Sequence, residues 1–149
     1  MATVDSRAIM QVGVVVRDIE KAARAYATLF GLDMPTIRNA FPTILYRGER
    51  VATKARLCGF QMGGVTLELV QPDDTETSWK EFLDTHGEGV HHIAVVVEDL
   101  EGAYQAMAEQ GITVRQYGGA QWGSYSFMDS EKALGVNISL KCNDPVEME

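Results

Sequence analysis

The chain has only two cysteines in 149 residues, Cys58 and Cys142, which lie far apart in the sequence and form no CxxC motif. This argues against a disulfide framework and predicts free thiols in a reducing compartment. No apolar run approaches the roughly 20 residues that span a bilayer, so we expect no membrane segment. The first residues lack the apolar stretch of a secretory signal, so we expect a cytoplasmic protein.

Basic residues are also scarce. Thirteen Lys and Arg stand against 21 Asp and Glu, which gives a formal net charge of −8. Nucleic-acid binding needs a basic face, so this balance argues against it. Segment 38–56 nevertheless concentrates five positive charges, namely Arg38, Arg47, Arg50, Lys54 and Arg56. Such a cluster is either a solvated face, which is the commoner case, or a contact for a substrate phosphate or carboxylate.

What the chain does contain is an internal duplication. Residues 11–27 and 92–108 share eight identities in seventeen positions without a gap. Each copy has a strand-like apolar run, an Asp, and an apolar stripe at helical spacing. Near the end of each copy the offset shortens from 81 to 71 residues, because Gly64-Val65-Thr66-Leu67 corresponds to Gly135-Val136-Asn137-Ile138. We therefore expect a loop-length change between the copies.

The pattern predicts an α+β fold built from tandem βαβββ repeats, whose curved mixed sheet surrounds a cavity. The first module spans 9–72, a linker with a short helix spans 73–89, and the second module spans 90–141, all within one structural domain. In the first module we expect an irregular stretch over 34–42 and a strand over 43–48. Ser78, with Glu81 three residues later, predicts the start of the linker helix through a capping box.

Four polar side chains occupy duplicated positions. In the last strand of each copy, alternation sets Glu68 or Ser139 on the face opposite the apolar residues. Gln11 and His92 open the two equivalent first strands. We expect these four to face the cavity and to converge. His91 points to the opposite face by alternation, so its predicted role is structural.

At these residues the sequence resembles the vicinal oxygen chelate superfamily of glyoxalases, bleomycin-resistance proteins and extradiol dioxygenases, and within it the methylmalonyl-CoA epimerases. The likeness is carried by GEGVHHIA, VVVRDIEKA, LFGL and GVTLELVQP, and it covers about residues 9–141. It implies a glyoxalase-like fold and a homodimer.

The resemblance also implies a metal site. In the epimerase family a divalent metal is held by a His, a Gln or Glu, the second His of a pair, and a Glu, which correspond here to Gln11, Glu68, His92 and Ser139. Two positions match and two depart. We therefore expect weak or absent binding of Co, Zn, Ni or Mn, with Glu68, His92 and Gln11 as ligands if a metal is present.

The reaction that this reduced set of metal ligands still allows is proton transfer at an acidic carbon next to a carbonyl, by a racemase or epimerase. Glu68, desolvated in a cavity, would be the base, and His92 the opposing acid. Gln11 or Ser139 would donate to the enolate oxygen. Extradiol dioxygenation needs two histidines and a carboxylate around iron, so the incomplete set argues against it.

Two substrate classes stay open. The basic cluster of 38–56 favours an acyl-CoA, with Lys54 and Arg56 as its predicted substrate contacts. The aromatic residues of the second copy favour an aromatic ketone, such as an isoflavanone of the dihydrodaidzein type, provided that they line the cavity rather than pack the sheet ends; they are Tyr117, Trp122, Tyr125 and Phe127, with Phe41 and Tyr46 opposite. The competing class is a non-catalytic protein that sequesters a small molecule, as bleomycin-resistance proteins do.

Overall fold

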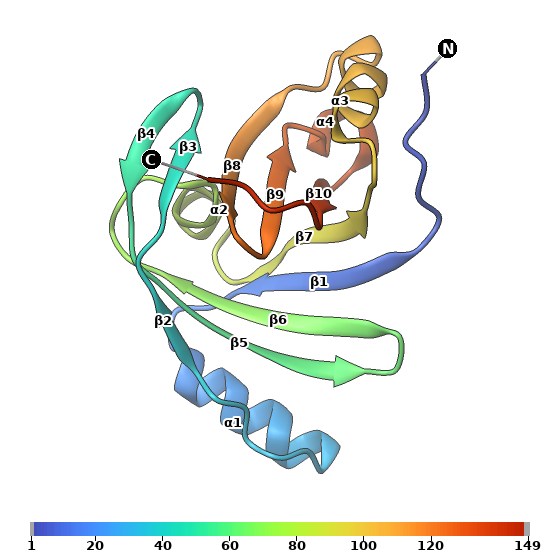
Figure 1. Ribbon diagram of the computed structural model, residues 1–149. Coiled ribbons are helices and arrows are strands. Elements are labelled where there is room, and N and C mark those ends of the chain that lie inside the picture. The colour runs from blue at the N-terminus through green and yellow to red at the C-terminus, as the bar shows by residue number, and fades with distance from the viewer. Residues whose placement is uncertain (1, 148–149) are drawn as a thin grey trace.

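The computed structural model describes residues 2–147, and in them a single curled sheet is combined with four helices (Figure 1). The strands are β1 (Ile9–Val15), β2 (Arg38–Ala40), β3 (Thr43–Tyr46), β4 (Glu49–Ala52), β5 (Ala55–Met62), β6 (Val65–Pro72), β7 (Gly89–Val96), β8 (Val114–Ala120), β9 (Gly123–Met128) and β10 (Asn137–Cys142). The helices are α1 (Ile19–Phe30), α2 (Ser78–His86), α3 (Leu100–Glu109) and α4 (Glu131–Leu134). In the described residues no helix is long and apolar enough to cross a membrane.

The sheet has the strand order β2-β5-β6-β1-β7-β10-β9-β8-β3-β4. At its centre, β1 and β7 pair antiparallel and bring Gly13 opposite His92. On either side each first strand pairs parallel with the last strand of its own module, β1 with β6 and β7 with β10. The α+β fold of tandem repeats is therefore confirmed, and the shared centre places Gln11 beside His92.

Each module packs its helix on the outer face of the sheet. Helix α1 begins after Asp18, whose side chain accepts a hydrogen bond from the Lys21 amide, and ends at Gly31, which has a left-handed φ of 64°. Helix α3 begins in the same way after Asp99. The apolar stripes pack against the outward residues of the strands, including Leu69 under α1 and Leu140 under α3. The alternate residues of the same strands therefore face the concave side of the sheet.

Segment 38–52 differs from the prediction. Residues 38–40, expected to be irregular, form β2 at one edge of the sheet, and the strand expected over 43–48 is part of the β3–β4 hairpin at the other edge. The hairpin turns at Arg47 and Gly48, which both have positive φ, as a two-residue type I′ turn requires. Its strand β3 pairs with β8 of the second module. Residues 41–42 thus connect the two edges, and the hairpin is the extra length of the first module.

Helix α2 forms where the linker helix was predicted, but its N-cap is Thr77 rather than Ser78. The Thr77 hydroxyl accepts from the Lys80 amide and is fully buried. Trp79 and Leu83 of α2 pack with Val15 and Phe127, which belong to different modules. This apolar cluster lies on the concave side, in addition to the two clusters under α1 and α3. Helix α2 therefore supports the floor of the space between the modules.

Candidate functional site

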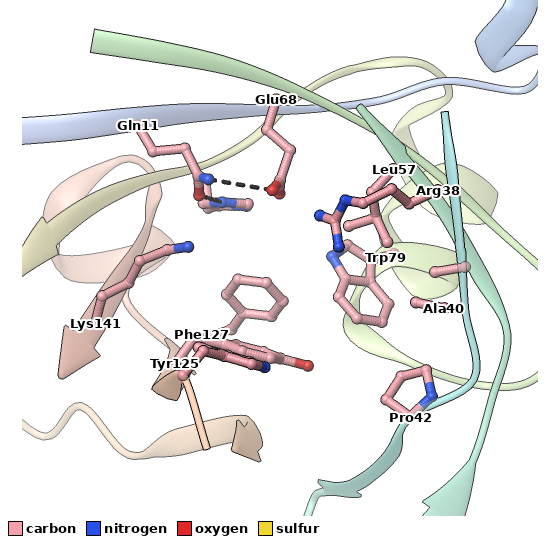
Figure 2. A pocket seen from close by; sticks show the side chains of 13 residues that line it. Gln11, Arg38, Ala40, Pro42, Leu57, Glu68, Trp79, Tyr125, Phe127 and Lys141 are labelled. Carbon is pink, nitrogen blue, oxygen red and sulfur yellow. Dashed lines mark hydrogen bonds between the residues drawn. The ribbon is translucent and has the colours of Figure 1, made fainter. Parts of the chain in front are cut away.

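The concave side holds a cavity of about 420 Å³ (Figure 2). Its walls come from both modules and from α2, because the inward residues of the curled strands converge there. The lining residues are Gln11, Arg38, Ala40, Pro42, Ala55, Leu57, Glu68, Trp79, His92, Trp122, Tyr125, Phe127 and Lys141. This size suits a small organic molecule or the reactive part of a larger one.

Three of the four duplicated polar residues meet in this cavity. The Gln11 amide donates to Glu68 Oε2 at 3.2 Å, and its carbonyl oxygen accepts from His92 Nε2 at 2.9 Å. Glu68 is half-buried, whereas Gln11 and His92 are buried. The structure therefore brings Gln11, Glu68 and His92 together, as the sequence predicted.

Ser139, the fourth of these residues, does not reach the cavity. It is fully buried opposite Phe127 in the β9–β10 ladder, and its hydroxyl finds no hydrogen-bond partner within residues 2–147. The ring of Phe127 lines the cavity instead. Ser139 is therefore not in a position to donate to a ligand there.

The predicted substrate-binding residues divide into two groups. Trp122, Tyr125 and Phe127 line the cavity, and the other four do not. Tyr117 lies on β8 opposite Leu45 of the hairpin, and the Tyr46 hydroxyl donates to Glu81 of α2. Lys54 and Arg56 border a second, outer hollow, where Lys54 lies over the Phe41 ring and Arg56 pairs with Glu20 at 2.7 Å. These four residues are structural or surface residues in this fold.

Three charged or aromatic lining residues were missed by the sequence analysis as individual contributors. Trp79 comes from the linker helix, whose contribution to the cavity no strand pattern signals. Lys141 lies two residues after Ser139 on the same strand face, so alternation could have identified it. Arg38 was noted only as part of a charge cluster, because its strand, β2, was not predicted.

A chain of hydrogen bonds leads from Glu68 into the interior. His91 and His92 join through their Nδ1 atoms at 2.8 Å, His91 Nε2 joins the Ser78 hydroxyl at 2.9 Å, and Arg115 donates to that hydroxyl at 3.4 Å. Arg115 can only donate, and an ionised Glu68 can only accept. Each group between them therefore donates toward Glu68.

This direction fixes the protonation of both histidines. His92 carries its hydrogen on Nε2, where it donates to Gln11, so its Nδ1 accepts from the Nδ1–H of His91. Desolvation by burial lowers the pKa of His91 to about 3, aided by the nearby charge of Arg115. Desolvation, followed by the effects of His91 and Lys141, lowers the pKa of His92 well below its ordinary value. Both rings are neutral at physiological pH.

Gly13 makes this arrangement possible. A Cβ atom at Gly13 would lie 2.0 Å from Cε1 of the His92 ring, so only glycine lets that ring lie against β1. In the second module the corresponding position is Ala94, which lies opposite Gln11 in the β1–β7 pair. The site is therefore built on a difference between the two copies.

The electrostatics of Glu68 suit a base. Desolvation raises the pKa of its carboxyl group, while Lys141, Arg38 and the Gln11 hydrogen bond act in the opposite direction. A carboxylate with a raised pKa binds a proton more strongly than a solvated one, which suits a group that takes a proton from carbon. In Figure 2, Arg38 and Lys141 extend into the cavity from opposite walls, with Glu68 between them.

The floor of the cavity is aromatic. The Phe127 ring lies 4.8 Å from Tyr125, 5.6 Å from Trp79 and 4.7 Å from His92, measured between centroids. Trp122 is 59% exposed and stacks parallel to Tyr125 at 6.4 Å, toward the mouth of the cavity. Such walls bind flat apolar ligands.

The donor set does not fit a divalent transition metal. Both nitrogens of His92 are engaged, with Gln11 and His91, and the Ser139 hydroxyl lies outside the cavity. Glu68 is then the one anionic ligand among the four corresponding positions. Within residues 2–147 no three His, Cys, Asp or Glu side chains are grouped as metal ligands. We therefore derive no chemical step through a metal.

Comparison with known proteins agrees with this architecture. A family model for the glyoxalase/bleomycin resistance protein/dioxygenase superfamily matches residues 10–127. The uncharacterized protein YqjC of Bacillus subtilis (strain 168) is 28% identical over 134 residues, which is 87% of each chain.

Among solved structures, methylmalonyl-CoA epimerase from Mycobacterium tuberculosis is similar, with a TM-score of 0.65, 20% identity, and coverage of 97% of this chain and 93% of that one. A variant of the Streptomyces coelicolor methylmalonyl-CoA epimerase in complex with 2-nitronate-propionyl-CoA has a TM-score of 0.66 and 19% identity, and covers 97% and 100%. At these identities the likeness establishes a shared fold.

Proposed function

The chain belongs to the glyoxalase/bleomycin resistance protein/dioxygenase superfamily, and from that premise we propose that it is an isomerase, a racemase or epimerase that moves a proton at a carbon next to a carbonyl. The observation that carries the proposal is Glu68, a half-buried carboxylate with a raised pKa in an aromatic cavity that also holds Lys141 and Arg38. The similar folds of the two epimerases support the same reaction class.

Glu68 is the base in this proposal. As its oxygen takes the α-proton, the bonding pair of the C–H bond moves into an enolate. Lys141 supplies the positive charge, which in a partly desolvated cavity stabilises the enolate oxygen. Gln11 holds the carboxylate in place through its amide.

Return of the proton to the other face needs a second donor. His92 was the candidate from the sequence, but its Nε2–H is committed to Gln11. Lys141 enters the cavity from β10, and Glu68 enters it from a different wall (Figure 2). The ammonium group of Lys141 can therefore deliver a proton to the carbon as the carbonyl forms again. Glu68 is left protonated and Lys141 neutral, and exchange with solvent restores both.

This cycle predicts uptake of solvent deuterium at the α-carbon. We would incubate the protein in heavy water with methylmalonyl-CoA and, separately, with dihydrodaidzein, and follow loss of the α-proton by NMR. Glu68→Gln should lower the exchange rate by on the order of 10²–10⁴-fold, since that is what a general base contributes. Glu98→Gln, a change at an exposed carboxylate, is the matched control.

The same samples test the metal. Activity that survives a chelator, and does not rise when Co, Zn, Ni or Mn is added, is the result expected from the donor set. Activity that requires one of these ions would overturn the assignment of Lys141 to the enolate.

A second candidate is a non-catalytic protein that sequesters an aromatic compound. The aromatic floor and the stacked pair Trp122 and Tyr125 favour it, because they suit binding without requiring Glu68. Tight binding of dihydrodaidzein with no deuterium uptake, in both the wild type and Glu68→Gln, would establish this candidate and exclude the isomerase.

A further inference from the structure

Two cations in the cavity have no partner in the described part of the chain. Across residues 2–147, Arg38 and Lys141 form neither a salt bridge nor a side-chain hydrogen bond, whereas Arg47, Arg56 and Arg115 are all ion-paired. Carboxylates are abundant in this chain, which has a net charge of −8. Unpaired cations inside a cavity of such a protein are a feature that a ligand would complete.

The charge of the cavity gives the charge of that ligand. With Arg38 and Lys141 positive and Glu68 ionised, the lining carries a net charge of +1, and no other lining residue is charged when His92 is neutral. When Glu68 has taken a proton, the lining carries +2 and faces an enolate. A substrate with one permanent negative charge would match the lining both before and after the proton transfer.

The two cations are suited to different tasks. Arg38 comes from β2 at the edge of the sheet and is exposed, and its planar guanidinium can bind a carboxylate through two parallel hydrogen bonds. Lys141 is half-buried on β10 and offers a compact charge. Figure 2 shows Phe127 and Tyr125 below Glu68, in the space between the two cations. The flat apolar part of a ligand can therefore occupy the middle of the cavity.

We propose that the substrate is a monoanionic aromatic carbon acid, with its anionic group on Arg38, its ring on Tyr125 and Phe127, and its acidic carbon at Glu68. This inference rests on the proposed function for the role of Glu68 alone. Recognition of the anion and the ring is a statement about binding, and it can be tested without turnover.

The test uses a matched pair of ligands. Phenylpyruvate has a benzylic carbon next to a ketone and a carboxylate, and phenylacetone has the same carbon and ketone with a methyl group in place of the carboxylate. Both tryptophans of the chain, Trp79 and Trp122, line the cavity, so intrinsic fluorescence reports binding there. Phenylpyruvate should bind at least tenfold more tightly than phenylacetone, as expected for a charge-assisted bidentate contact.

Arg38→Met should remove this preference by weakening phenylpyruvate at least tenfold while leaving phenylacetone unchanged. The control is Arg56→Met, which removes an arginine that lies outside the cavity and pairs with Glu20. Arg56→Met should leave both affinities as they are.

Each failure has a distinct signature. Equal affinities for the two ligands, an equal effect of Arg38→Met on both, or no binding of either at millimolar concentration would overturn the inference. Preferential binding of phenylpyruvate without exchange of its benzylic protons, measured by NMR in heavy water beside an enzyme-free sample, would leave the inference standing and overturn the proposed isomerase.

Discussion

Gln11 connects the carboxylate of the cavity to the buried histidines. Its amide donates to Glu68 and its carbonyl accepts from His92, so one neutral side chain satisfies both neighbours. A side-chain amide has an N–H donor and a carbonyl acceptor on the same group, so Gln11 can bond to both neighbours at once. Desolvation raises the pKa of Glu68, and the Gln11 hydrogen bond lowers it, as Lys141 and Arg38 do more strongly.

Replacing Gln11 by Met should shift the pH dependence of the proposed reaction. The Gln11 hydrogen bond lowers the pKa of Glu68, so its loss raises that pKa further above the ordinary value. Because the base acts when ionised, the acid limb of kcat/KM for deuterium exchange should move to higher pH.

Ser139→Ala is the control for this shift, because the Ser139 hydroxyl has no hydrogen-bond partner among residues 2–147 and lies outside the cavity. It should leave the acid limb where it is. An acid limb unmoved by Gln11→Met, or moved to lower pH, would show that Glu68 is not the titrating base.

At the scale of elements, α2 connects the two modules. It carries Trp79 into the cavity wall and Ser78 to the His91 ring, so its N-terminal turn must be held in register. Thr77 holds it by capping the helix through the Lys80 amide. The sequence placed this cap one residue later, because Ser78 and Glu81 have capping-box spacing. The Ser78 hydroxyl is instead used by His91.

Thr77→Ala should lower the free energy of unfolding by about 1 kcal/mol, the usual contribution of an N-cap hydroxyl. Thr77→Ser keeps the hydroxyl and should recover most of the loss, and urea denaturation monitored by circular dichroism measures both. Thr85→Ala removes a hydroxyl near the other end of α2, where it bonds to the Glu81 carbonyl, and should cost less. Equal effects of Thr77→Ala and Thr77→Ser would argue against the cap.

The β3–β4 hairpin has an equally specific role. It joins β8 of the other module, and Tyr46 and Arg47 bond to Glu81 of α2. Tyr46 was predicted to contact the substrate, and the structure assigns it to this attachment. The hairpin thus closes the far edge of the sheet and keeps α2 beneath the cavity.

For the whole molecule, the buried histidines predict a loss of stability in acid. His91 has a pKa of about 3 in the folded state against an ordinary 6.5, and the pKa of His92 is also lowered. Below pH 6.5 the unfolded chain therefore binds more protons than the folded one, and the free energy of unfolding falls as the pH falls. The slope should reach roughly 1.4 kcal/mol per pH unit for each histidine.

Glu68 acts with the opposite sign, because its raised pKa means that the folded state binds the extra proton above pH 4.5. Glu68→Gln should therefore steepen the decline between pH 6.5 and 4.5, as measured by urea denaturation. His86→Gln removes the exposed third histidine and should leave the slope as it is. A flat profile over this range would contradict the neutral assignment of His91 and His92.

Much of the fold was predictable because the repeated patterns are local. Alternation along β6 and β10 sets Leu69 and Leu140 under the helices, and Asp18 and Asp99 start the two helices where expected. The convergence of Gln11, Glu68 and His92 followed from the duplication. The 9–72 and 90–141 division into modules, the homodimer and the roles of the site residues stay predictions.

The rest depended on contacts between distant segments. No local pattern indicates that 43–52 leaves its own module to pair with β8, that Arg38 forms an edge strand, or that α2 brings Trp79 into the cavity wall. Hydrogen-bond partners of side chains are equally distant in sequence: His92 is bonded to Gln11, 81 residues away in the chain.

The sequence by itself determined the duplicated α+β architecture and the face on which Gln11, Glu68 and His92 lie, because both follow from the period of a strand or helix. His91 was expected on the opposite face but lies beside His92, because the pairing of β1 with β7 shifts register between Gly13 and Val14. Only the tertiary structure decided which of those residues share the cavity. That outcome depends on how the sheet curls and on which partner each donor finds, and neither is set by neighbours in the chain.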